Sequence, residues 1–276
     1  MNGACGIVKA RSIYQATRAL LFADIPAIDL KDRVSVFTVA AGMRSTGVLE
    51  TWGQWLPQLR EAMITHGLFT SVATSVWSAI ARPLDLPYRS LLLALDAKRV
   101  AGKPKHVLWI HTSKEVRDQY RQARFTQQEA GALLAYPACC IEFESRVMAQ
   151  LPQAQLQTLI AEVGEDEATL MTALQRKKEI PVAKIPLPNN ALRTEQRFPF
   201  ALHVACDECL ENPESPSAVL NARNGDLVEE IDAGLHSLIL QVQNLYCGVG
   251  EDQANNLILF SRMRSLHSGF LSGQQP

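Results

Sequence analysis

The chain has 276 residues, of which 47% are hydrophobic and 20% charged, and this balance excludes a disordered or fibrous protein. Its formal net charge of −1 gives no general basic field, so we predict no nucleic-acid partner. The apolar runs at 91–95 and 235–242 fall short of the roughly 20 residues of a membrane span, and the first residues lack the apolar core of a signal peptide, so we predict a cytoplasmic protein without membrane contact.

The first 125 residues predict an α/β part with a small sheet. Apolar residues at spacings of three and four indicate helices, and short β-branched or apolar runs indicate strands. Gly67 and Pro83 mark two of the helix ends. We expect helices over 11–25, 47–67 and 70–83, the second of which can be two helices, and strands over 33–41, 90–96 and 106–113.

The residues from 126 onward predict a mostly helical part. Thr126 and Glu129 form a capping box, and Pro137 stands where a further helix begins. Three prolines between 179 and 190 exclude a helix there and predict an extended connector. We expect helices over 114–124, 126–134, 137–151, 152–163 and 165–178.

One more helix is predicted after the second cysteine motif. Ser215 followed by Pro216 indicates an N-cap and the first residue of a helix. A regular apolar stripe from Leu227 to Leu245 predicts one long helix that ends at Gly248. The predicted fold class is therefore helix-rich α+β. An α/β part spans 1–125 and a helical cysteine-motif part spans 126–276, and the two can form one continuous domain.

Four of the six cysteines lie in two close pairs. Cys139 and Cys140 are adjacent, and Cys206 and Cys209 form a Cys-x-x-Cys motif after an interval of 65 residues, 141–205. In a reducing cytoplasm we interpret such cysteines as metal ligands, redox groups or free thiols rather than as disulfides. Four thiolates meet the ligand count of a tetrahedral zinc site or of an iron–sulfur cluster.

The spacing within each pair bears on what is bound. A Cys-x-x-Cys turn places both sulfurs on one side, whereas the side chains of adjacent residues are expected to diverge. Cys139 and Cys140 therefore favour a metal cofactor larger than a single ion. We predict an iron–sulfur cluster, with zinc as the alternative. The positive end of the helix that begins after Pro137 would stabilise thiolates or an anionic cluster.

His203 extends the spacing of Cys206 and Cys209 by one more step of three. We interpret it as a fifth candidate metal ligand or as a proton donor, because a mixed ligand set can leave an iron open to substrate. If one cysteine is not needed by the metal, Cys140 or Cys139 could act as a nucleophile or carry sulfur. The candidate catalytic residues are thus His203 and Cys140.

Two other interpretations of the cysteines stay open. Cys206 and Cys209 could form a thiol–disulfide redox pair without a metal. Against it, the motif opens no evident helix after a strand, and its acidic interior, Asp207 and Glu208, would raise the pKa of the thiols. Free cysteine also behaves as a small buried hydrophobe, so simple packing is the remaining alternative.

Several polar residues outside the cysteine motifs are weaker candidates. His111 ends a predicted strand, where catalytic groups occur, but a structural histidine is the preferred interpretation. Tyr136 is expected to pack or to donate a hydrogen bond near Cys139. Asn189, Asn190 and Arg193 are interpreted either as ligands of an anionic substrate or as part of a solvated loop.

Two resemblances accompany these motifs. The stretches "GALLAYPACCIEFES", "NNALRT" and "FPFALHVACDECLENPESPSAVLNA" resemble a prokaryotic family defined as domain of unknown function 483, over roughly 126–222. Ala135 stands where that family has glycine. The resemblance implies shared metal-site residues and little about the reaction. The two cysteine pairs are also similar in order to those of ferric-siderophore reductases, which hold a [2Fe–2S] cluster.

Together these features predict a cysteine-ligated metalloenzyme, iron–sulfur dependent, that performs redox or sulfur-transfer chemistry on a small-molecule substrate. An electron or sulfur donor protein is the partner that such chemistry would need. The alternatives are a zinc-stabilised interaction or regulatory protein and a metal-free thiol–disulfide reductase. Nothing in the sequence indicates the oligomeric state.

Overall fold

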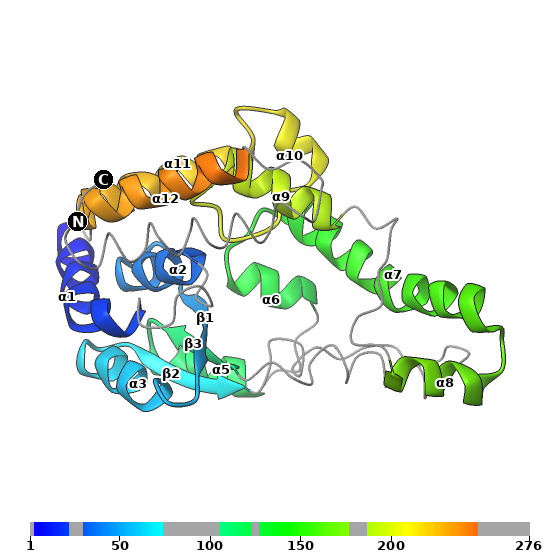
Figure 1. The fold of residues 1–276 in the computed structure, drawn as a ribbon. Helices are drawn as coiled ribbons and strands as arrows, with labels where there is room; N and C mark the ends of the chain where they lie inside the picture. Colours follow the sequence, from blue (N-terminus) through cyan, green and yellow to red (C-terminus); the bar gives the residue numbers. More distant parts are fainter. Residues whose placement is uncertain (1–2, 22–29, 74–104, 123–126, 177–186, 248–276) are drawn as a thin grey trace.

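The protein has a helix-rich α+β fold, as the sequence predicts (Figure 1). An N-terminal three-stranded antiparallel sheet with helices is followed by a mostly helical C-terminal region. No described helix combines the length and apolar character that crossing a bilayer requires. The computed structural model describes residues 3–21, 30–73, 105–122, 127–176 and 187–247.

The N-terminal region combines helices with a small sheet whose central strand is buried on both faces. The sheet order is β1-β3-β2, with both neighbours antiparallel to β3. Leu108 and Ile110 of β3 face the main core, whereas Val107 and Trp109 pack on the opposite side. The elements are α1 (Gly3–Leu21), α2 (Leu30–Ala40), β1 (Thr46–Trp52), α3 (Leu56–Thr65), β2 (Phe69–Ala73), β3 (Lys105–His111) and α5 (Lys114–Gln122).

The C-terminal region consists of helices that surround the cysteine motifs. The extension of α7 and the short α8 project away from the remaining helices (Figure 1). The elements are α6 (Gln127–Leu133), α7 (Ala138–Val163), α8 (Glu167–Arg176), α9 (Leu187–Arg197), α10 (Asp207–Glu211), α11 (Pro216–Ile231) and α12 (Ala233–Cys247).

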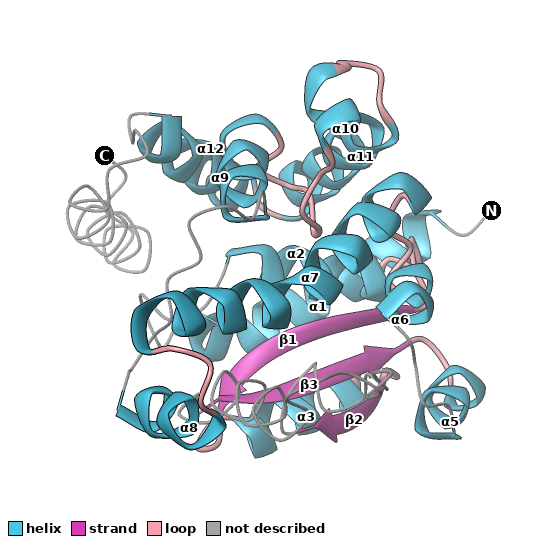
Figure 2. Ribbon diagram, turned by 90° about the vertical axis from the view of Figure 1, so that its right-hand side faces the viewer, coloured by secondary structure: helices cyan, strands magenta, loops and turns pink. Residues whose placement is uncertain are grey.

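The main hydrophobic core joins the two regions of the chain. In Figure 1 the sheet lies below α1 and α2, which in turn lie below α11 and α12, and the side view in Figure 2 shows the same strands running beneath α1, α2 and α7. Ile13 of α1, Phe37 of α2 and Leu108 of β3 belong to one buried cluster with Val228 of α11 and Leu235 of α12. This core therefore crosses the boundary that the sequence predicts at residue 125.

The predicted strand over 33–41 is wrong, because this segment lies in α2. All residues from Arg33 to Ala40 are buried. A helix surrounded on every side by the protein carries no apolar stripe of period 3.6, and its β-branched residues then resemble a strand.

The helix predicted over 47–67 is wrong at its beginning, and the helix predicted over 70–83 is wrong at 70–73, while 74–83 lie outside the described residues. Strand β1 occupies 46–52 and β2 occupies 69–73, and α3 alone forms the helix that ends before Gly67. Pairing with β3 on both sides determines these strands, and such tertiary pairing overrides local propensity. The strand predicted over 106–113 is confirmed as β3, whereas the one over 90–96 lies outside the described residues.

Three boundaries in the C-terminal region also differ from prediction. Helix α7 runs unbroken through the segment expected to begin a separate helix at 152, and α9 begins at Leu187, inside the predicted connector. The long helix predicted to end at Gly248 is interrupted at Asp232, whose backbone is extended. The Asp232 side chain accepts hydrogen bonds from the Leu235 N–H (3.0 Å) and the Tyr14 hydroxyl (2.6 Å). Asp232 therefore starts α12 and ties it to α1.

Candidate metal centre

Four cysteine sulfurs from two distant segments converge at one point. The Sγ atoms of Cys139, Cys140, Cys206 and Cys209 all lie within 4.8 Å of one another. Cys209 Sγ lies 3.5 Å from Cys139 Sγ and 3.6 Å from Cys140 Sγ, and Cys140 Sγ lies 3.8 Å from Cys206 Sγ. Cys140, Cys206 and Cys209 are buried, and Cys139 is partly exposed. The chain thus contains a largely buried four-cysteine group that could bind a metal.

The first turn of α7 supplies the adjacent pair. Pro137 is the N-cap, with φ −59° and ψ 136°, and its carbonyl accepts hydrogen bonds from the N–H groups of Cys140 and Ile141. Within this turn the sulfurs of Cys139 and Cys140 are 3.9 Å apart, and both approach Cys209. The expectation that adjacent thiols diverge is therefore wrong at this position.

The Cys-x-x-Cys pair is supplied by the beginning of α10. Cys206 is the N-cap, in an extended conformation, and Cys209 lies in the single turn that follows, so the motif does open a short helix. The backbone N–H of Cys206 donates to Cys140 Sγ at 3.4 Å. An N–H directed at a ligating sulfur would stabilise its thiolate form.

Helix α9 braces the loop that carries Cys206. Asn190 is buried, and its Nδ2 donates to Ala205 O and to Asp207 Oδ1, both at 3.1 Å. The Thr194 hydroxyl accepts from the Ala205 N–H at 2.9 Å, and Arg193 forms an ion pair with Asp207 at 3.1 Å. Asn190 and Arg193 thus contact the residues on either side of Cys206. The side chain of Asn189 lies outside the described part of the chain.

A second layer of polar groups connects the cysteines to His203. The Ser217 hydroxyl lies 3.3 Å from Cys140 Sγ and 2.8 Å from His203 Nε2. His203 is buried and stacks at a tilt against Tyr136, with 5.3 Å between ring centroids. The structure places His203 behind Ser217 rather than among the four sulfurs. Sequence reasoning missed Ser217, because the Ser215–Pro216 cap indicates a helix start but not where the next hydroxyl points.

Burial dominates the protonation of the two α7 thiols. It raises the pKa of Cys139 to about 11 and raises that of Cys140 as well. Burial also acts on Cys209, but hydrogen bonds from Ser217 and from the other two thiols lower the pKa of Cys209 overall. The predicted stabilisation of thiolates by the field of α7 is thus outweighed at Cys139 and Cys140. A metal would have to displace these protons.

His111 has the environment of a structural histidine. Its ring is fully buried, and its two nitrogens lie 3.3 Å from Thr46 Oγ1 and 3.0 Å from Ser71 Oγ. Thr46 belongs to β1, Ser71 to β2 and His111 to β3. The histidine therefore joins the three strands at one end of the sheet, as expected for the structural interpretation.

No family model matches the chain, and no curated protein and no solved structure shows significant similarity to it. The resemblance to domain of unknown function 483 therefore stays a prediction. The geometry of the four cysteines is the observation from which a function has to be argued.

Proposed function

We propose that Cys139, Cys140, Cys206 and Cys209 bind a single zinc ion in a tetrahedral site. The observation that supports this proposal is the spacing of the sulfurs. With zinc–sulfur bonds of about 2.3 Å, the edge of a regular tetrahedron is about 3.8 Å. Neighbouring sulfurs in the group are 3.5–3.9 Å apart, and all four lie within 4.8 Å of one another.

An iron–sulfur cluster fits this spacing less well. In a cluster, several irons and bridging sulfides lie between the cysteine ligands, so thiolates bound to different irons are farther apart than thiolates on one ion. Here all four sulfurs lie within 4.8 Å of one another, as ligands that share one ion do. The spacing therefore favours the zinc alternative over the cluster that the adjacent cysteines suggested.

The proposed role of the ion is to hold the helical region together. Its ligands would join the first turn of α7 to α10, across a sequence separation of 66 between Cys140 and Cys206. Four protein ligands fill a tetrahedral ion, and such closed sites are typical of structural zinc. Around the sulfurs, Phe143 and Val147 of α7 pack with Phe198 and Leu210 in a small separate core. The metal would compensate for the limited apolar area of that core.

The partial exposure of Cys139 favours a second candidate, the metal-dependent enzyme predicted from the sequence. An exposed metal-bound thiolate is accessible to a small molecule, whereas the other three sulfurs are buried. In this alternative an iron–sulfur cluster would serve redox or sulfur-transfer chemistry, with a donor protein as partner. His203 would then supply protons through Ser217.

Metal measurements on protein purified without oxygen test the proposal. Zinc, iron and acid-labile sulfide would be measured per chain in the wild type and in C139A, C206A and C5A. Cys5 is an exposed cysteine away from the site, so C5A is the matched control. We expect one zinc in the wild type and in C5A, and loss of zinc in the other two variants because each lacks one ligand.

The other outcomes of the metal measurements separate the candidates. Iron and sulfide together with broad visible absorbance, lost in C139A and C206A, would replace zinc by a cluster and support the enzyme. One iron per chain without sulfide would keep the tetrahedral site but change its metal. No metal in the wild type, or equal metal in all four proteins, would overturn the proposal.

A further inference from the structure

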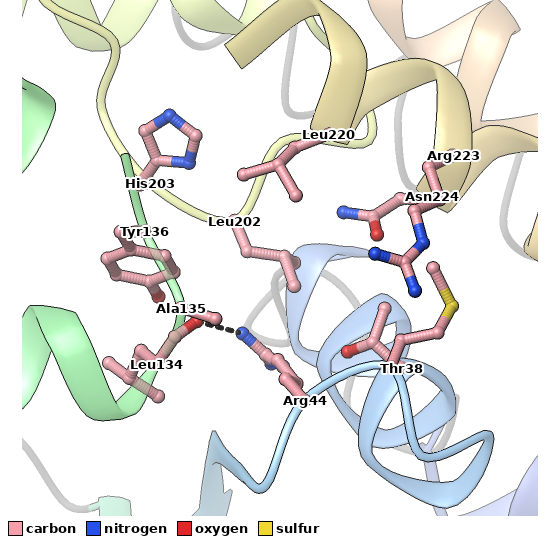
Figure 3. Close-up of a pocket in the computed structure, with 11 residues that line it drawn as sticks. Thr38, Arg44, Leu134, Ala135, Tyr136, Leu202, His203, Leu220, Arg223 and Asn224 are labelled. Carbon is pink, nitrogen blue, oxygen red and sulfur yellow. Dashed lines mark hydrogen bonds between the residues drawn. The ribbon is translucent and has the colours of Figure 1, made fainter. Parts of the chain in front are cut away.

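A pocket lies beside His203 (Figure 3), which contacts Ser217 and through it the four-cysteine group. Its wall comes from α2, the loop that follows α2, the connection between α6 and α7, the loop before α10, and α11. The space between these residues is about 360 Å³, a figure that includes the solvent at its open mouth. Elements from both ends of the chain therefore combine to form it.

The polar lining of this pocket is cationic. Arg44 and Arg223 both line it, and no aspartate or glutamate is among the lining residues. Tyr136, which also lines the pocket, and the nearby Asp32 both favour the charged form of Arg44. Figure 3 shows the Arg223 guanidinium between Asn224 and Thr38, and the Arg44 guanidinium below Leu202 with its hydrogen bond to Leu134. Two like charges around one space favour an anion between them.

The Arg44 side chain is built into the protein with part of its hydrogen-bonding capacity unused. It is only 9% exposed, and its Nε has no hydrogen-bond partner among the described residues. Its Nη2 donates to Ser35 Oγ, and its Nη1 makes a long contact of 3.4 Å with Leu134 O. Burial lowers the pKa of Arg44, while Tyr136 and Asp32 act in the opposite direction.

Arg223 offers a second guanidinium from α11. It is exposed, and its side chain makes no hydrogen bond or ion pair within the described part of the chain. Leu202 and Leu220 form apolar walls beside the two arginines. Such a site would hold a charged group by its arginines and the carbon skeleton of a ligand by its leucines.

We propose that this pocket binds a small-molecule anion, whose carboxylate or phosphate group lies between Arg44 and Arg223. The proposal goes beyond the metal centre and does not depend on which metal the cysteines hold. The two sites are nevertheless connected, because His203 lines the pocket and contacts Ser217, which contacts Cys140. An anion in the pocket would therefore lie against a wall that the metal centre supports.

Calorimetric titration with inorganic phosphate and, separately, with acetate tests this proposal at constant ionic strength. The proteins are the wild type, R223Q and R146Q, with metal content measured in each. Arg146 is an exposed arginine on α7 that does not line the pocket, so R146Q matches the change in net charge. We expect saturable binding of at least one anion with one site per chain, weakened at least about tenfold in R223Q and unchanged in R146Q.

The preferred probe identifies the anionic group, and a third variant tests the buried arginine. Stronger binding of phosphate points to a phosphorylated ligand, and stronger binding of acetate to an organic acid.

R44K keeps the positive charge of Arg44 but lacks the planar guanidinium fork, so we expect it to weaken anion binding in folded protein. Thermal unfolding checks that the variant is folded. Absence of saturable binding below about 10 mM, or equal weakening in R223Q and R146Q, would overturn the proposal. Metal loss in C206A with retained anion binding would leave it intact.

Discussion

Ser217 lies between the four cysteines and His203, which lines the pocket. Its hydroxyl lies near Cys140 Sγ and His203 Nε2, and its hydrogen bonds lower the pKa of Cys209. A group that favours thiolates around a metal without binding it tunes the affinity of the site. Ser217 thereby favours the charged form of the Cys140 and Cys209 thiols in a buried environment that otherwise disfavours it.

We expect S217A to retain the metal site but to bind zinc about 10 to 100 times more weakly, because a supporting hydrogen-bond partner of the ligands is lost. Competition with a chelator of known affinity measures this change. S237A is the control, since Ser237 is exposed on α12 and its hydroxyl accepts a hydrogen bond from Gln241, away from the cysteines. Equal zinc affinity in S217A and the wild type would contradict this role.

The cysteines and the pocket differ in how far the sequence predicts them. Two close pairs of thiols indicate a common ligand through their own spacing, so Cys139 and Cys206 are assigned to one site from the sequence alone. Arg44 and Arg223 lie in unrelated segments, and neither forms part of a motif. Only the packing of α11 on α1 and α2 brings them to one pocket. Long-range packing of this kind leaves no local signal in a single sequence.

At the scale of elements, the turn between α6 and α7 positions the first pair of cysteines. Ala135 has a φ of 54°, which lies in the left-handed region that residues other than glycine rarely adopt. Glycine would adopt this conformation without strain, because it has no Cβ.

We expect A135G to raise the free energy of unfolding by about 0.5–1 kcal/mol, since relief of the left-handed strain exceeds the added freedom of the unfolded chain. Ala132 is exposed in α6, so A132G should instead lower stability by about 1 kcal/mol. Urea unfolding of the three proteins measures both changes. A loss of stability in A135G would show that the turn does not carry this strain.

Elements that are buried on all sides or paired across the fold account for the wrong secondary-structure predictions. Helix α2 is buried all round and shows no helical period, and β1 and β2 owe their conformation to β3. The N-cap predicted at Ser215, by contrast, is confirmed, because its Oγ accepts a hydrogen bond from the Ala218 N–H at 3.2 Å. Local capping chemistry is readable from sequence, whereas tertiary environment is not.

At the scale of the whole molecule, two of the hydrophobic cores in the described residues differ in kind. The main core joins α1, α2 and the sheet to α11 and α12 and contains no metal-site cysteine. The smaller core around the four cysteines joins α7 to the loop and helix that carry Cys206 and Cys209. The main core is therefore expected to survive loss of the metal, while the smaller one depends on it.

Hydrogen exchange on zinc-loaded and zinc-depleted protein tests this division. We expect the backbone amides of Cys140 and Leu210 to exchange at least about 100 times faster without zinc, because the ligands no longer hold α7 against α10. Amides of Leu108 and Ile110 in β3 should change by less than about threefold, since the main core encloses them. C206A, which lacks a ligand, should reproduce the pattern without a chelator. Uniform loss of protection over both cores would mean that the metal stabilises the molecule as one cooperative unit.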